Sequence, residues 1–108
     1  MTVKELSPQE FLARRAAGTA MTLVDVREPW ETQLAPVPTT LLHIPMGQIT
    51  TRLKELDPQA EIVVICRSGG RSMQVAQFLA AQGFTSLYNL TGGILAWSRD
   101  VDPNIPQY

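Results

Sequence analysis

Short runs of apolar residues alternate along the chain with segments in which apolar residues recur at helical spacing. The runs at 21–26, 41–44, 62–65 and 87–90 predict four strands. The third run, Ile-Val-Val-Ile, has no polar alternation, which is typical of a strand with helices on both of its faces. Strands that alternate with helices indicate an α/β domain with a largely parallel sheet.

The segments between these runs predict helices. Residues 7–10, Ser-Pro-Gln-Glu, have the sequence of a helix start capped by Ser7, and Gly18 is expected to end that helix in a left-handed turn. Apolar residues at i, i+4 and i+7 predict another helix over 49–56. Two more helices are expected, one ending at Gly83 and one beginning at the glycine pair before Ile94.

Composition limits the class of protein. With 108 residues, 44% of them apolar and 18% charged, we expect one globular domain over 1–108. A net charge of −1 gives no general attraction to nucleic acid or to an acidic membrane surface. The chain has neither a signal-peptide core nor an apolar stretch of the roughly 20 residues that cross a membrane. We therefore expect a cytoplasmic protein without nucleic-acid or membrane partners.

The cysteine count limits the chemistry further. One cysteine cannot form an internal disulfide, and one cysteine with one histidine cannot build a Cys/His metal cage. No metal and no cofactor are therefore expected. A free thiol suits a reducing compartment.

The only cysteine, Cys66, directly follows the apolar run 62–65 and opens the segment Cys-Arg-Ser-Gly-Gly-Arg-Ser over 66–72. A buried strand would deliver this thiol to a glycine-containing loop that opens a helix. The backbone amides of such a loop, together with a helix amino terminus, form a concavity that binds anions. Arg67 and Arg71 favour the thiolate, which is the reactive form of cysteine. The sequence therefore predicts a cysteine nucleophile in an anion-binding loop.

The remaining loop residues also fit this hypothesis. Gly69 and Gly70 permit backbone conformations that aim successive N–H groups at one point, and Ser68 and Ser72 offer hydroxyl hydrogen bonds. A cysteine without such neighbours is more often buried and inert. The glycines and arginines around Cys66 argue against that structural interpretation.

The length of the loop separates two kinds of thiolate chemistry. Cysteine-dependent phosphatases use a similar loop that is longer by one residue, whereas here four residues, 67–70, separate Cys66 from Arg71. A shorter ring holds a smaller group, so a sulfur atom bonded to Cys66 fits it better than a tetrahedral phosphate. Phosphatase or arsenate reductase chemistry is the less favoured alternative.

Asp25 and Arg27, at the end of the first predicted strand, are candidates for supporting the pocket, because ligands bind outside the carboxyl ends of strands in open parallel sheets. A carboxylate at a strand end is at least as often a turn former. For Arg27 an ion pair with a nearby carboxylate is favoured, with Glu28 and Glu31 among the candidates. For His43 a hydrogen-bonded packing role is favoured over that of a base.

Three motifs together resemble the rhodanese sulfurtransferases of the small single-domain type. Residues 23–31, Leu-Val-Asp-Val-Arg-Glu-Pro-Trp-Glu, are similar to the family's first signature. The segment 66–72 is similar to its six-residue active-site loop and the serine after it, and 83–84 with 88–97 are similar to its carboxyl-terminal signature. The resemblance covers nearly the whole chain.

The resemblance implies a rhodanese-like fold, with a central five-stranded parallel sheet flanked by helices on both faces, and a thiosulfate sulfurtransferase reaction. Cys66 would attack the sulfane sulfur of thiosulfate or another donor, release sulfite and become a persulfide. Cyanide in vitro, or a thiol or protein acceptor in the cell, would then take the sulfur. Arg71 would be the first electrostatic partner of an anionic donor, and Arg67 the second.

Two further stretches bear on the resemblance. Family members often carry Gly-His-Ile-Pro-Gly-Ala after the first signature, and the segment Ala35–Leu41 departs from this pattern, which affects the expected shape of the pocket rim. The tail over 97–106 is similar to rhodanese domains attached to ubiquitin-activating-like adenylyltransferases, so a sulfur-carrier pathway is one hypothesis. A non-catalytic rhodanese-like interaction module is the alternative, and the intact Cys66 loop argues against it.

Overall fold

The computed structural model describes residues 3–39 and 42–108. In these residues the strands form one five-stranded sheet in the order β1-β5-β4-β2-β3, and all neighbouring strands are parallel. The strands are β1 (Val3–Leu6), β2 (Thr22–Asp25), β3 (Leu42–His43), β4 (Ile62–Ile65) and β5 (Leu87–Leu90). The helices are α1 (Pro8–Ala16), α2 (Pro29–Leu34), α3 (Gly70–Ala81) and α4 (Gly93–Asp100).

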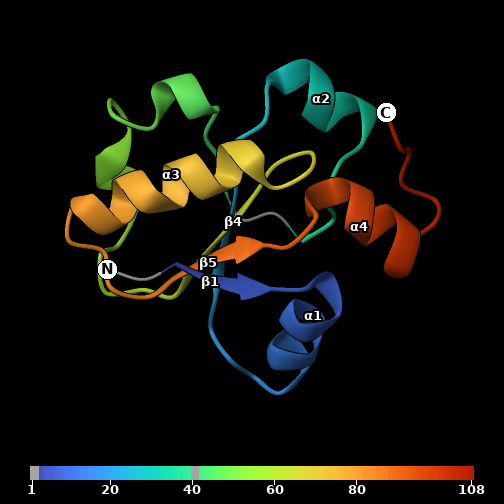
Figure 1. Cartoon of the computed structure of the whole chain (residues 1–108), viewed down its shortest axis with the longest axis horizontal. Coiled ribbons are helices and arrows are strands. Elements are labelled where there is room, and N and C mark those ends of the chain that lie inside the picture. Colours follow the sequence, from blue (N-terminus) through green and yellow to red (C-terminus); the bar gives the residue numbers. More distant parts are fainter. Residues whose placement is uncertain (1–2, 40–41) are drawn as a thin grey trace.

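Helices cover both faces of the sheet, and Figure 1 shows α1 and α3 on opposite sides of β1 and β5. Successive residues of β4 point to opposite faces, and all four are buried. Val63 and Ile65 pack in one apolar core with Phe11 of α1 and Trp97 of α4, whose rings lie 5.9 Å apart. Ile62, Val64 and Cys66 pack in a second core beneath α3. The expected α/β fold with a five-stranded parallel sheet is therefore confirmed.

The start of α1 forms as predicted. The Glu10 amide donates to the Ser7 hydroxyl at 3.1 Å, and the Ser7 amide donates to the Glu10 carboxylate at 2.8 Å. Gly18, just after the helix, has a φ of +90°, which is the predicted left-handed turn.

The predicted helix over 49–56 is wrong. The chain instead makes two separate 3₁₀ turns, Met46–Gln48 and Leu53–Glu55. The Thr51 hydroxyl donates to the Gln48 carbonyl at 3.1 Å, a local bond that competes with regular helix formation. Ile49 and Leu56 are still buried, so the apolar spacing indicated the buried side of the segment but not its backbone.

The pattern also missed two elements, the edge strand β1 and the short helix α2. Within the atypical segment 35–41, Ala35 and Val37 are buried in the core shared with α1 and α4. The last two residues of that segment, 40–41, which include the start of the strand predicted over 41–44, lie outside the described residues.

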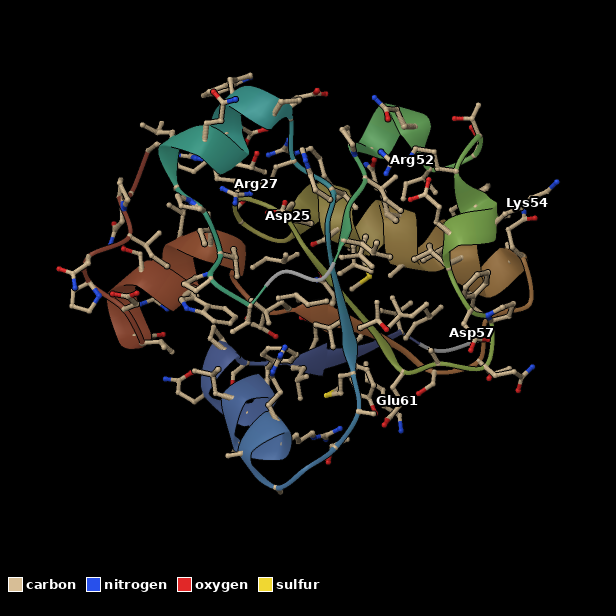
Figure 2. The ribbon with its side chains drawn as sticks, turned by 180° about the vertical axis from the view of Figure 1, so that it is seen from behind. Asp25, Arg27, Arg52, Lys54, Asp57 and Glu61 are labelled. Atoms are coloured by element: carbon tan, nitrogen blue, oxygen red, sulfur yellow. The ribbon has the colours of Figure 1, made fainter. Side chains whose placement is uncertain are left out.

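Parallel strands bring several chemically active residues to one edge of the sheet. Asp25 pairs in register with Ile65, so the end of β2 lies beside the residue that precedes Cys66. Figure 2 shows Asp25 and Arg27 together near α2, at the end of the sheet opposite Glu61. Within the described part of the chain, no helix has the length and apolar character needed to cross a membrane.

Candidate active site

Cys66 is the first residue after β4, and its side chain packs in the core beneath α3, where it is 1% exposed. The chain then turns through Arg67 and Ser68 to Gly69. Gly69 has a φ of +113°, a conformation that glycine adopts readily and other residues do not. Helix α3 begins at Gly70, so the loop ends on a helix amino terminus, as the sequence predicts.

The Cys66 sulfur lies within hydrogen-bond reach of the loop. The Gly69 amide donates to Sγ at 3.1 Å, and the thiol donates to the Ser72 hydroxyl oxygen at 3.3 Å. Burial raises the pKa of the thiol, but hydrogen bonds from the Ser72 hydroxyl and from the amides of Ser72, Gly69 and Ser68 outweigh it. The net pKa of Cys66 is therefore below the ordinary value, and the loop favours a sulfur anion.

The amino terminus of α4 holds the other side of the loop. The Ile94 amide donates to the Cys66 carbonyl at 2.9 Å, and the Leu95 amide donates to the Arg67 carbonyl at 3.1 Å. This close approach requires glycine at position 93, because a Cβ there would lie 2.5 Å from each of those carbonyl oxygens. The glycine pair of the carboxyl-terminal signature thus fixes the backbone of the cysteine loop.

Arg71 forms a bidentate ion pair across the loop. Its two terminal nitrogens donate to the carboxylate oxygens of Glu31 on α2 at 2.7 and 2.8 Å. The hydrogen bonds from Arg71 lower the pKa of Glu31 to about 2, against the smaller effect of burial. The Arg71 charge is therefore matched by a carboxylate, and its expected role as first partner of an anionic donor stays a prediction.

Arg67 lies at the exposed rim of the loop. Its guanidinium donates to the carbonyl oxygen of Tyr108 and lies 5.3 Å from the centre of the Tyr108 ring. The same ring meets the edge of Trp30, which is 62% exposed. The tail of the chain therefore returns to the rim of the site.

Asp25 and Arg27 form a buried ion pair that holds the end of α2. The favoured ion pair of Arg27 with a nearby carboxylate is confirmed, but its partner is Asp25, at 2.8 Å, and neither Glu28 nor Glu31. Arg27 also donates to the Ala35 carbonyl at 2.8 Å. The His43 ring bonds to the Arg27 carbonyl at 2.7 Å, the hydrogen-bonded role that was favoured.

Sequence reasoning missed the partners that hold the loop. Asn89 accepts the hydroxyl proton of Ser72 at 2.5 Å, and Tyr108 donates to Glu31 at 2.8 Å. Asn89 falls within the carboxyl-terminal signature, so that motif pointed to its neighbourhood. No pattern in the sequence singles out Tyr108.

Comparisons with known proteins show which family the chain resembles. The protein-family model described as the rhodanese-like domain matches residues 7–100 of this chain. The chain is 48% identical to the chloroplastic rhodanese-like/PpiC domain-containing protein 12 of Arabidopsis thaliana, over 98% of this chain but only 38% of that protein. It is 37% identical to a sulfurtransferase of Allochromatium vinosum, over 90% of both chains.

A solved structure gives the same result for the fold. A rhodanese-like domain protein from Staphylococcus aureus superposes with a TM-score of 0.81 at 27% identity, over 98% of this chain and 99% of that one. Three observations point to the same family. They are the match of the family model, the sulfurtransferase relative of similar length, and the cysteine loop at the end of β4. The chain belongs to the rhodanese-like domain family.

Proposed function

We propose that the protein is a sulfurtransferase that carries a sulfane sulfur on Cys66. The observation that supports this most directly is the position of Sγ, 3.1 Å from the Gly69 amide and at the amino terminus of α3. The terminal sulfur of a persulfide is an anion. Backbone amides such as that of Gly69 stabilise an anion by hydrogen bonding, without a metal or cofactor. The sulfurtransferase name of the Allochromatium relative supports the same reaction class.

The proposed reaction has two displacement steps. The Cys66 thiolate attacks the outer sulfur of thiosulfate, a new S–S bond to Sγ forms, and the old S–S bond breaks to release sulfite with its electron pair. Cyanide, or a thiol or protein acceptor, then attacks the terminal sulfur and restores the thiolate. Ping-pong kinetics are expected because the sulfur stays on the enzyme between the two steps.

The rim of the loop supports an anionic donor. Arg67 is exposed there, and Arg71 is the second cation of the loop, although Glu31 matches its charge. The proposed acceptors in the cell are small thiols or a sulfur-carrier protein, consistent with the tail that resembles adenylyltransferase-linked rhodanese domains. A reducing compartment such as the cytoplasm would keep Cys66 ready for the next cycle.

The test is formation of thiocyanate from thiosulfate and cyanide. We expect turnover by the intact chain and its loss in Cys66→Ala and Cys66→Ser. Mass spectrometry after thiosulfate treatment should find one added sulfur on Cys66, and cyanide should remove it. Turnover equal to that of the Cys66 variants, across several sulfane-sulfur donors, would contradict the proposal.

A further inference from the structure

A buried amide lies directly behind the cysteine loop. Asn89 of β5 is 5% exposed, and Ser72 of α3 is fully buried. The Ser72 hydroxyl oxygen lies 2.5 Å from Asn89 Oδ1, 3.2 Å from the Gly69 carbonyl oxygen and 3.3 Å from Cys66 Sγ. One hydroxyl therefore stands between an amide oxygen and the sulfur.

Glu5 determines which way the Asn89 amide faces. Asn89 Nδ2 lies 3.3 Å from Glu5 Oε2 and 3.3 Å from the Gly69 carbonyl oxygen. Both of these atoms are acceptors, so the amide must direct its N–H groups to them, and Oδ1 then faces Ser72. The Thr91 hydroxyl donates to Glu5 Oε1 at 2.8 Å and holds the carboxylate in place.

Ser72 has a single hydroxyl proton for these acceptors. With Cys66 as a thiol, the S–H group donates to Ser72 and the Ser72 hydroxyl donates to Asn89. When Cys66 loses its proton, the sulfur becomes an acceptor, and the hydroxyl must turn away from Asn89 to bond it. We propose that Asn89 is a positioning residue for Cys66. Asn89 fixes the Ser72 hydroxyl beside the Cys66 sulfur and competes with that sulfur for the hydroxyl proton.

Other charges also surround the Cys66 sulfur, and of these Glu5 is a direct hydrogen-bond partner of Asn89. The groups on the elements packed around the loop are Arg67 and Arg71 in the loop, Glu31 on α2, Glu5 on β1, the Asp25–Arg27 pair after β2, and the amino termini of α3 and α4. A shift that acts through Ser72 is therefore separated from any change at Glu5 by comparing Asn89 variants with and without the Ser72 hydroxyl.

The test is the pH dependence of Cys66 alkylation by iodoacetamide, an uncharged reagent. Because the chain has one cysteine, the adduct mass reports on Cys66 alone. Asn89→Leu keeps a similar volume and removes the nearest competing acceptor, so that only the Gly69 carbonyl, at 3.2 Å, still competes with the sulfur for the Ser72 proton. We expect the alkylation midpoint to fall by about 0.5–1 pH unit, because the Ser72 hydroxyl no longer gives up a neutral hydrogen bond to Asn89 when it bonds the charged sulfur.

The Ser72→Ala background separates a specific effect from a structural one. In the Ser72→Ala background, Asn89→Leu should cause no further shift of the alkylation midpoint, because residue 72 then has no hydroxyl that Asn89 could hold. Asn89→Ala serves as a second variant that adds no atoms, with circular dichroism as the check of folding. Thr51→Val is the matched control, since it removes an exposed hydroxyl that bonds the Gln48 carbonyl, outside the contacts of Ser72 and Asn89, and should leave the midpoint unchanged.

Two results would overturn the proposal. One is an unchanged or higher midpoint in both Asn89 variants, and the other is an equal shift with and without Ser72. The inference rests on the proposed function only in taking the Cys66 thiolate as the nucleophile of the reaction. Alkylation needs no sulfur donor, so a chain that forms no thiocyanate would still show whether Asn89 acts on Cys66.

Discussion

The carboxylate of Glu31 shows how one residue links the cysteine loop to the rest of the molecule. It is 4% exposed, and it accepts two hydrogen bonds from Arg71, one from the Tyr108 hydroxyl and one from the Glu28 amide. A buried carboxylate surrounded by donors is stable as an anion and costly to protonate. Glu31 therefore connects the stability of the fold to pH.

We predict that Glu31→Gln flattens the pH dependence of stability on the acid side. The pKa of Glu31 is about 2 in the folded protein and near 4.5 when unperturbed, so its contribution is complete above about pH 4.5 and is lost as the pH falls toward 2. Discounted for the partly exposed Arg71, this contribution is roughly 1–3 kcal/mol. Urea unfolding at steps from pH 7 to 3 measures it.

Glu55→Gln is the matched control for this prediction. Glu55 also pairs with an arginine, Arg52, at 2.7 and 2.9 Å, but the side chains of this pair are 43% and 33% exposed. Solvent weakens such a pair, so its loss should change the acid slope much less. Equal slopes for the two variants would contradict the assigned role of Glu31.

Single residues differ in how far the sequence reveals them. Cys66 could be predicted because its whole context, strand, glycines and arginines, is contiguous in the chain. The partner of Arg71 could not, since Glu31 is 40 positions away and meets it only after α2 and α3 are placed. Arg27 pairs with Asp25 because both leave the end of β2 together.

Among the elements, α4 contacts the backbone of the cysteine loop from outside it. Its first turn donates to the carbonyls of Cys66 and Arg67, and Gly93 permits this contact with a φ of +58°. We predict that Gly93→Ala displaces the loop, because the added Cβ overlaps both carbonyl oxygens at 2.5 Å. Thiocyanate formation should fall on the order of 10–100-fold, and the free energy of unfolding by about 1–3 kcal/mol.

Gly47→Ala provides the comparison for Gly93. Gly47 lies in the 3₁₀ turn Met46–Gln48, and a Cβ there would meet nothing within 4 Å. It should leave both turnover and stability nearly unchanged. Full activity in Gly93→Ala would show that α4 does not fix the loop.

Strands and helices could be predicted where the apolar positions of the sequence are also the buried positions of the structure. Strand β4 is apolar at all four positions and was found, whereas β1 exposes Lys4 and Glu5 at the edge of the sheet and carries no such signal. The six-residue α2 is too short for a periodic pattern, although Pro29 at its start and Glu31 in its first turn are start signals. The wrong helix over 49–56 shows that apolar spacing reports burial more reliably than backbone geometry.

At the scale of the whole molecule, a chain of hydrogen bonds joins four separate segments around the site. It runs from Asp25 to Arg27, then through the Tyr108 hydroxyl to Glu31 and on to Arg71. The parallel topology brings the end of β2 beside the cysteine loop, and the returning tail supplies the central hydroxyl. That tail position depends on packing after α4, which explains why no local pattern predicted it.

We predict that Tyr108→Phe destabilises the fold by about 1–2 kcal/mol, because it leaves a buried Arg27 N–H and an oxygen of Glu31 each without one partner. Tyr88→Phe is the matched control. Its hydroxyl also joins an arginine and a glutamate, Arg14 at 3.2 Å and Glu61 at 3.1 Å, but these partners reach solvent. Water can replace the lost hydroxyl there, so chemical denaturation should show a smaller loss for Tyr88→Phe. Equal losses in the two variants would mean that the Tyr108 hydroxyl does not connect the buried Asp25–Arg27 pair to the Glu31–Arg71 pair at the cysteine loop.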